Sequence, residues 1–398
     1  MAWRMSSVED QRKAFIAICL EGKHTMADIC RMYNISRQTG YKWLNRKRDG
    51  DEDCLKDRSR TPLSQPNKTE QELVDDILAV RHCFPKWGPR KVFAWLKRTR
   101  PEVAWPSTTT IGLLFNKNGL TVSRNIRRRV PGKTAPLAHC QQPNDVWCVD
   151  FKGWFLTLDG SKCEPFTLTD GASRFLLRCL RLNRNDTNHV WGAMDSAFRE
   201  FGLPYYMRSD NGPPFASCGV GRFSELSIRL IKAGVTPEWI DPGKPQQNGR
   251  HERMHQTLKS ETAMPPEETL EMQAEKHQNF QEYYNFIRPH EALGQETPGS
   301  VYVASEREWD GVLRSPEYGR EYTVRSVRQN GSIRWKGEEI YVGKTLSGEP
   351  IGLKEIEDGR HEVRYGPIIL GAIDMNNGFM IPPGNKRKRR KVSIIEDG

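Results

Sequence analysis

The sequence predicts a multidomain protein with helical units first, an α/β core in the middle and a small β-barrel last. Apolar residues recur at helical spacing over the first 120 residues, apolar strands alternate with helices from residue 145, and hairpin signals follow residue 318. At 398 residues, the chain exceeds the length of one ordinary domain. We expect domains at 1–48, 65–130, 140–300 and 318–380, and a basic tail at 381–398.

The composition favours a polyanionic partner. Lysine and arginine number 61 against 50 aspartates and glutamates, a net charge of +11, and contacts from such residues to phosphates release counterions. The nine cysteines form no CxxC pair, so a zinc finger has no support. The sequence shows neither a signal peptide nor an apolar run of the roughly 18 residues that cross a membrane. We therefore expect a cytoplasmic protein with free thiols.

The first helical unit has a helix-turn-helix pattern. Apolar residues of 25–33 fall at helical spacing, and Ser36 suits the N-cap of the next helix. That helix carries Arg37, Gln38 and Lys42, which we expect to contact DNA. The alternative is a small helical pair with a solvated basic face.

A second unit repeats this pattern over residues 65–130. Pro89 suits the first turn of its second helix, and Ser107 suits the N-cap of its third. A basic stretch with Arg127 and Arg128 follows and is a further candidate for DNA contact. The alternative is a purely structural helical adaptor.

Three carboxylates stand out in the predicted α/β core. Asp150 follows an apolar strand, and Asp210 ends another strand just before the Asn211-Gly212 turn signal. Glu252 precedes a run of helix-forming residues. If the two strands are neighbours, Asp150 and Asp210 meet at one sheet edge, and a helix that crosses this edge can bring in Glu252.

Phosphodiester chemistry would explain such a group of acids. Hard divalent ions such as Mg²⁺ take oxygen ligands, and two ions about 4 Å apart activate the attacking oxygen and stabilise the leaving one. For any single acid, a helix cap or a solvated charge is the alternative. Asp170, Asp241 and Glu164 are rivals that spacing does not exclude, although Asp170 also fits a simple turn with Gly171.

Two turn signals indicate hairpins in the last segment. Asn330-Gly331 lies between apolar residues and is the strongest short hairpin signal, and Asp358-Gly359 marks another. Several short strands of this kind predict a small barrel. The basic run at 386–391 is typical of a tail that contacts nucleic acid non-specifically, with a nuclear-import signal as the alternative.

Four linked motifs occur in order: W-C-V-D-F at 147–151, R-S-D-N-G-P-P-F at 208–215, P-Q-Q-N-G-R-H-E at 245–252, and the short elements Y-N, R-P-H and T-P within 284–298. They resemble the DDE transposase and retroviral integrase (rve) superfamily, in particular the transposases of bacterial insertion sequences. The resemblance covers about residues 140–300 and is weaker in the segments before and after them. It implies an RNase H-like fold for the core.

The resemblance also implies a site and a reaction. Asp150, Asp210 and Glu252 would hold two Mg²⁺ or Mn²⁺ ions. Water would nick the ends of a mobile element, and the freed 3′-hydroxyl would attack target DNA without a covalent enzyme intermediate. The partners would be double-stranded DNA and further copies of the chain at the bacterial nucleoid, with no membrane and no small-molecule substrate.

Three residues near Glu252 have further expected roles. Lys259, two turns along, would contact DNA, whereas Gln256 departs from the basic residue that relatives often carry. His251 either approaches the scissile phosphate, or packs or faces solvent. Two other classes of protein stay open: a DNA-binding regulator with an inactive core, and a nuclease that only hydrolyses. Intact acids at all three motif positions favour an enzyme over the regulator.

Overall fold

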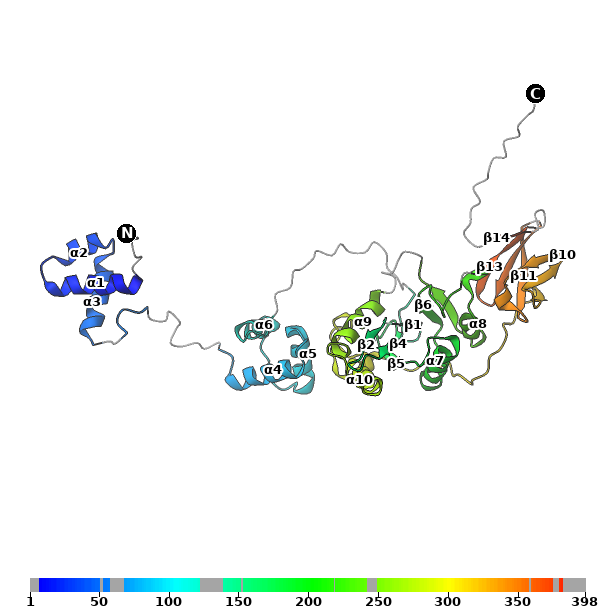
Figure 1. Cartoon of the computed structure of the whole chain (residues 1–398), viewed down its shortest axis with the longest axis horizontal. Coiled ribbons are helices and arrows are strands. Elements are labelled where there is room, and N and C mark those ends of the chain that lie inside the picture. Colours follow the sequence, from blue (N-terminus) through cyan, green and yellow to red (C-terminus); the bar gives the residue numbers. More distant parts are fainter. Residues whose placement is uncertain are drawn as a thin grey trace, which may run out of the picture. The chain divides into compact units, whose positions relative to one another are not determined.

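The protein is described from a computed structural model (Figure 1). The structure describes residues 7–50, 53–57, 68–121, 139–151, 153–217, 219–241, 249–357, 359–374 and 379–381. They belong to two compact units, Met1–Glu70 and Gln71–Gly398. Arg127, Arg128 and the basic run at 386–391 lie outside the described residues. Among the described helices, none is long and apolar enough to cross a membrane.

The first unit contains three helices, and the last two match the predicted helix-turn-helix. The helices are α1 (Val8–Glu21), α2 (Met26–Met32) and α3 (Arg37–Arg48). Ser36 is the N-cap of α3, as predicted, and its hydroxyl accepts a hydrogen bond from the backbone N of Thr39 at 3.1 Å. The buried core consists of Phe15, Ile16, Ile29, Cys30 and Trp43.

The second unit begins with three more helices around their own core. They are α4 (Gln71–Cys83), α5 (Pro89–Thr99) and α6 (Thr108–Lys117). Pro89 lies in the first turn of α5, and Ser107 caps α6, as the sequence predicts. The buried cluster consists of Ile77, Val80, Trp87, Val92, Leu96, Ile111 and Phe115.

The core that follows is built on a mixed five-stranded sheet in the order β5-β4-β1-β6-β7. The strands are β1 (Val146–Phe151), β4 (Pro165–Asp170), β5 (Leu176–Arg181), β6 (Tyr206–Ser209) and β7 (Thr236–Trp239). Along the chain, a short separate hairpin of β2 (Phe155–Leu156) and β3 (Lys162–Cys163) comes between β1 and β4. β1, β4 and β5 pair antiparallel, whereas β1, β6 and β7 pair parallel. The sequence predicts three strands, followed by helices that alternate with two further strands, and this order is confirmed.

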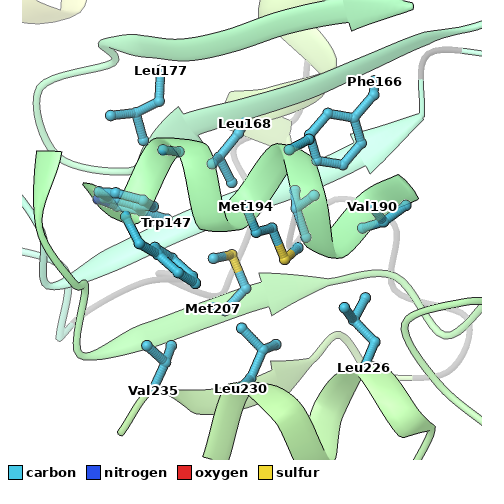
Figure 2. Packing of buried hydrophobic residues seen from close by; sticks show 14 of the residues in the cluster. Trp147, Phe166, Leu168, Leu177, Val190, Met194, Met207, Leu226, Leu230 and Val235 are labelled. Atoms are coloured by element: carbon cyan, nitrogen blue, oxygen red, sulfur yellow. The ribbon is translucent and has the colours of Figure 1, made fainter. Parts of the chain in front are cut away.

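Helices cover both faces of this sheet. The strands are followed by α7 (Thr187–Phe201), α8 (Glu225–Lys232), α9 (Gly249–Thr262) and α10 (Leu270–Glu282). All six positions of β4 are buried, because alternate residues of this strand face opposite layers. Phe166 and Leu168 pack towards α7 (Figure 2), whereas Thr167 and Thr169 face α9.

The last segment folds into two small sheets. One is five-stranded in the order β14-β13-β12-β11-β8, and the other is the pair β10-β9. The strands are β8 (Thr323–Ser326), β9 (Ser332–Trp335), β10 (Glu338–Tyr341), β11 (Pro350–Glu357), β12 (Arg360–Tyr365), β13 (Ile368–Asp374) and β14 (Phe379–Ile381). The pair lies beside both edges of the larger sheet. Among the described strands, no hydrogen-bonded ladder closes this arrangement, so the barrel stays a prediction.

Of the two predicted hairpins in this segment, one is confirmed and one is wrong. Asp358-Gly359 joins β11 to β12, which pair antiparallel up to Glu357 and Arg360; Asp358 itself lies outside the described residues. Asn330-Gly331 forms a turn, but β8 pairs with β11 and β9 pairs with β10. The backbone N of Val327 already donates to the carbonyl of Glu349 at 3.0 Å, so the chain is paired elsewhere before it enters the turn.

Two helical glycines differ in the space around them and give a test of this packing. A Cβ at Gly40 in α3 would lie 2.7 Å from Cys30 Sγ and 3.0 Å from Phe15, whereas one at Gly192 in α7 would meet nothing within 4 Å. We expect Gly40→Ala to destabilise its unit by about 1–3 kcal/mol through overpacking. Gly192→Ala should instead stabilise its helix by about 0.5–1 kcal/mol. Amide hydrogen exchange over α1–α3 and over α7 measures both, and faster exchange in α7 would contradict the packing described.

Candidate active site

Two of the predicted acids lie at one edge of the core sheet. β1 and β6 are parallel neighbours, with Cys148 beside Arg208. Asp150 is the fifth residue of β1 and Asp210 directly follows β6, so both acids lie at the carboxyl ends of neighbouring parallel strands.

The turn after β6 fixes the second acid. The Asp210 Oδ1 atom accepts a hydrogen bond from the backbone N of Gly212 at 3.1 Å, which is an Asx-turn. Asn211 donates from Nδ2 to the carbonyl of Ile240 at 2.9 Å and accepts from Arg222 at 3.0 Å. The turn is therefore tied to the end of β7, and Asp210 is held at the carboxyl edge of the sheet.

Helix α9 is fastened to β4 by two histidines one turn apart. His251 lies between two threonine hydroxyls, with Nε2 at 2.8 Å from Thr167 Oγ1 and Nδ1 at 2.8 Å from Thr169 Oγ1. His255 Nε2 lies 2.7 Å from the same Thr167 hydroxyl. Both histidines are buried, so these contacts replace the water that the ring nitrogens lose on folding.

The hydroxyl of Thr167 determines which nitrogen of each ring carries a proton. It donates its single hydrogen to the carbonyl of Asp150 at 3.1 Å, and therefore accepts from Nε2 of both histidines. Thr169 then donates to Nδ1 of His251, so this ring is neutral. Burial lowers the pKa of His251 to about 3, in agreement with that assignment. Of the roles expected for His251, the structure supports packing.

His255 links this network to the first acid. Its Nδ1 atom is 3.9 Å from the carboxylate of Asp150, whose side chain is 22% exposed. Among the described residues, Asp150, His251 and His255 form the one group of three potential ligand residues with atoms within 4.8 Å of one another. Because threonine hydroxyls occupy both ring nitrogens of His251, we interpret the group as a support for Asp150 rather than as a metal centre.

The third predicted acid lies on the neighbouring surface of α9. Glu252 follows His251 directly and is exposed, as are Gln256 and Lys259 at helical spacing from it. In the part of the chain that the structure describes, neither Glu252 nor Asp210 belongs to a three-residue ligand group. The structure thus brings Asp150 and Asp210 to one edge and Glu252 to the adjoining helix, without gathering the three carboxylates.

Asp170, a rival acid, has a structural role. It is buried, and its carboxylate accepts from the backbone N of Asn144 at 2.8 Å and from the N and hydroxyl of Ser173 at 2.7 and 2.6 Å. These contacts close the turn between β4 and β5, as the Asp170-Gly171 pair predicts. Burial raises the pKa of this carboxyl group.

The predicted DNA contacts in the described residues are all exposed. Arg37, Gln38 and Lys42 are exposed residues of α3, and Lys42 Nζ lies 5.0 Å from the centroid of the Trp43 ring. Lys259 lies on the same side of α9 as Glu252.

The anchoring role of His255, Thr167 and Thr169 was not predicted from the sequence. Two signals could have indicated it: the i,i+4 spacing of the histidines and the alternation of two hydroxyl residues on one face of a buried strand.

Five family models match segments of the chain. Residues 141–245 and 233–298 match two models described as integrase core domain. Residues 6–56 and 39–114 match models of a homeodomain-like domain, and residues 322–379 match the C-terminal domain of IS481 family transposases.

Two relatives come from bacterial insertion elements. An uncharacterized protein of insertion element IS407 from Burkholderia multivorans is 26% identical over 246 residues, which cover 61% of this chain and 85% of the relative. An uncharacterized protein of insertion element IS476 from Xanthomonas euvesicatoria is 25% identical over 244 residues, 61% of this chain and 67% of the relative.

Similar solved structures include two viral integrases. The catalytic core of HTLV-2 integrase in complex with magnesium aligns with a TM-score of 0.32 and 16% identity, over 41% of this chain and 98% of the integrase chain. A chain of the simian T-cell lymphotropic virus intasome aligns with a TM-score of 0.36 and 15% identity, over 73% of this chain and 97% of the intasome chain.

The core domain is therefore that of a polynucleotidyl transferase, and the helical units are helix-turn-helix DNA-binding domains. The matches to integrase core models, to the IS481 C-terminal domain and to proteins of bacterial insertion elements together support a bacterial insertion-sequence transposase of the integrase-core (rve) superfamily.

The threonine–histidine contacts lead to a stability prediction. Thr167→Val removes the acceptor of two buried imidazole N–H groups while keeping the shape of the side chain. We expect it to lower the free energy of unfolding by about 1–3 kcal/mol, the usual cost of unsatisfied buried donors. Thr323→Val, at an exposed position of β8, is the matched control and should change it little. Urea unfolding measures both, and equal stabilities would contradict the anchoring role of Thr167.

Proposed function

We propose that this chain is a transposase that binds the terminal repeats of a mobile element, nicks the DNA at its ends and transfers the freed 3′-hydroxyl to target DNA. Asp150, Asp210 and Glu252 are the proposed catalytic residues. The observation that carries the proposal is the parallel pairing of β1 and β6, because Asp150 lies near the end of β1 and Asp210 directly follows β6. Helix-turn-helix units in the same chain supply a means of holding duplex DNA.

The residues present fit divalent metal ions in the chemistry of their donors. Asp150, Asp210 and Glu252 offer carboxylate oxygens, which are the ligands that Mg²⁺ and Mn²⁺ prefer. Two such ions would activate the attacking oxygen and stabilise the leaving one. Two carboxylates on neighbouring strands repel each other, and a cation between them removes this cost. We therefore propose that these three residues hold two Mg²⁺ or Mn²⁺ ions.

Glu252 completes the proposed site from α9. Its exposed side chain is free of the buried anchor formed by His251, its direct neighbour in sequence. The anchored helix fixes the backbone of Glu252, while the long side chain keeps its rotational freedom. We propose that the carboxylate of Glu252 turns towards the Asp150–Asp210 edge when metal and DNA bind, with Lys259 on the same side of α9 to contact the DNA.

The protein groups then have distinct tasks in the reaction. The acids at the sheet edge would hold the metal ions that orient the scissile phosphate, while the first helix-turn-helix unit, through Arg37, Gln38 and Lys42, holds the terminal repeat and excludes other sequences. Joining two ends requires two active sites, so we propose that the chain acts as an oligomer assembled on DNA. As an enzyme of a bacterial element, it would act in the cytoplasm at the nucleoid.

Conservative replacement of each acid tests the proposed triad. We expect Asp150→Asn, Asp210→Asn and Glu252→Gln each to abolish strand cleavage and joining, because an amide cannot replace a carboxylate as a charged metal ligand. Glu271→Gln, at an exposed position of α10, is the matched control and should keep full activity. The assay combines purified protein, labelled element-end DNA, a plasmid target and Mg²⁺.

The products of this assay also separate the competing functions. Joined product from the wild type, with end binding kept in all three variants, agrees with the proposal. A variant that still joins DNA would remove its residue from the site. Nicking without joining would favour a nuclease, and specific binding without cutting would favour a regulator with an inactive core.

A further inference from the structure

A strongly cationic cavity lies beside α9, along the stripe of this helix next to that of Glu252. It has a volume of about 660 Å³ and is lined by residues of α5, α9, the β4–β5 turn and the segment after α10. Five of its side chains are basic: Lys91, Arg174, Arg250, Arg253 and Arg288. Among the described lining residues, Glu291 is the one acid, and it is exposed and pairs with Arg90 at 2.5 Å.

The cavity wall also contains residues of the last family motif, which the proposed reaction does not use. Tyr284, Arg288 and His290, from the Y-N and R-P-H elements of that motif, all line it. His290 Nε2 lies 3.2 Å from the carbonyl of Tyr284, and burial is the first of several causes that lower the pKa of His290 to about 3. The imidazole is therefore neutral, and the charge of this wall comes from Arg288.

Four arginines of the cavity, of which Arg253 is exposed and the other three are half-buried, lie together without acidic partners among the described residues. No ion pair of Arg174, Arg250, Arg253 or Arg288 occurs within the described ranges. Arg174 Nη1 is buried and has no hydrogen-bond partner in that part of the chain. Lys91 donates to the carbonyl of Pro289 at 2.8 Å, and burial, with Arg288 as the second cause, lowers its pKa to about 7. Gathering these cations costs free energy that a bound anion would recover.

The backbone of Arg174 adds a further sign of a built site. Its φ is 67°, in the left-handed region that side chains other than glycine rarely adopt. This conformation directs the chain through the tight turn closed by Asp170, next to Arg250, whose Nη1 donates to the carbonyl of Gly171 at 2.9 Å. Strained non-glycine residues concentrate at binding sites, where the surrounding structure holds them.

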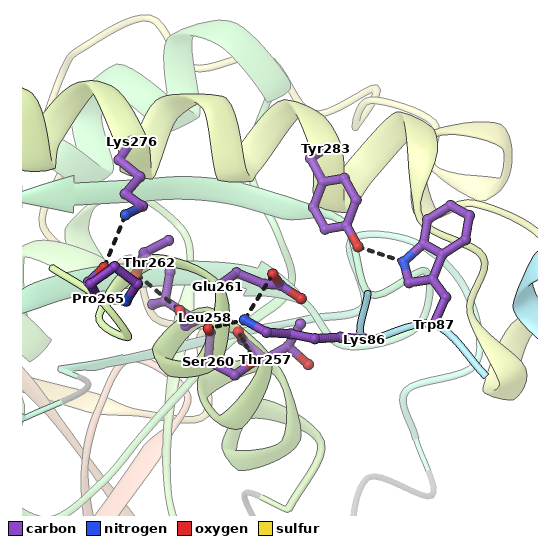
Figure 3. A network of polar contacts seen from close by, with 10 residues as sticks. All are labelled: Lys86, Trp87, Thr257, Leu258, Ser260, Glu261, Thr262, Pro265, Lys276 and Tyr283. Carbon is purple, nitrogen blue, oxygen red and sulfur yellow. Dashed lines mark hydrogen bonds and ion pairs between the residues drawn. The ribbon is translucent and has the colours of Figure 1, made fainter. Parts of the chain in front are cut away.

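The α5 wall of the cavity is held against the core by direct contacts. Trp87, in the loop before α5, donates from Nε1 to the hydroxyl of Tyr283 at 2.6 Å (Figure 3). Lys86 contacts the carbonyl of Ser260 and, at 3.1 Å, the carboxylate of Glu261. The second helix-turn-helix unit and the catalytic core thus share this cavity.

We propose that this cavity binds a backbone phosphate of the DNA that the enzyme processes, with Arg174, Arg253 and Arg288 as its main ligands. Planar guanidinium groups bind phosphate oxygens through paired hydrogen bonds, which explains arginine at four of the five basic positions. Arg250, Arg253 and Thr257 form one stripe of α9, and Glu252, Gln256 and Lys259 form the next. A phosphate in the cavity would therefore fix the register of the duplex relative to the acids. The inference rests on the proposed function, because DNA is the ligand.

The salt dependence of DNA binding tests this inference without catalysis. Full-length protein and a labelled duplex are titrated at several salt concentrations in the presence of a chelator. We expect Arg253→Gln with Arg288→Gln to reduce the slope of log K against log salt by about 0.9 for each phosphate that the variant no longer neutralises. Arg253→Lys with Arg288→Lys keeps the charge and should keep the slope. Arg314→Gln with Arg360→Gln, at positions that do not line the cavity, is the matched control and should also keep the wild-type slope.

A second measurement uses the wild type and does not depend on variants that fold. Phenylglyoxal modifies accessible arginines, and mass spectrometry reads the extent of reaction at each position. Bound duplex should protect Arg253 and Arg288 more strongly than inorganic phosphate at equal ionic strength. Equal slopes for the glutamine variant and the wild type, or no protection by DNA, would overturn the inference. Protection by inorganic phosphate alone would show that the phosphate bound in the cavity does not come from DNA. If the wild type does not cut DNA but the slopes of wild type and glutamine variant still differ, the proposed reaction is wrong and the assignment of the cavity stands.

Discussion

The arrangement of the core depends on the attachment of α9 to β4 through Thr167 and Thr169. These hydroxyls satisfy three ring nitrogens of His251 and His255 in a buried layer, and Thr167 also bonds the carbonyl of Asp150. One contact network therefore fixes the strand that carries the first acid and the helix that carries Glu252. Because buried polar groups without partners are costly, the helix has one favourable register on the sheet. That register directs Glu252 to one side of α9 and the arginines of the cationic cavity to another.

Local signals in the sequence predicted the framework of this core. Four apolar residues begin the strand that carries Asp150, and the Asn211-Gly212 turn follows the strand before Asp210. Ser36, Pro89 and Ser107 have the helix-terminal roles that their side chains favour. The Asp170-Gly171 turn was also predicted from neighbouring residues alone. In each case the competing structures are few, because the deciding contacts lie within four residues along the chain.

Features that depend on distant segments were not predicted. The Asn330-Gly331 turn forms, yet its flanking strands separate because Val327 pairs with Glu349, a choice that the turn residues do not encode. The contacts of His255 with Thr167 join positions 88 residues apart. The cationic cavity likewise unites Lys91 with arginines of three later segments, so that basic residues scattered in the sequence form one site. Such sites require the register of helices on a sheet, which the periodicity of one element does not determine.

Iron-directed cleavage of the polypeptide would test most directly whether the acids share a metal site. Fe²⁺ replaces the native ion in the full-length protein bound to element-end DNA, and ascorbate with peroxide then cuts the backbone near the metal. The account predicts cuts close to Asp150, Asp210 and Glu252, all absent from the Asp210→Asn variant. Cuts near Asp150 and α9 that persist in this variant and are absent around Asp210 would instead assign the metal to Asp150, His251 and His255, and would contradict the proposed catalytic site.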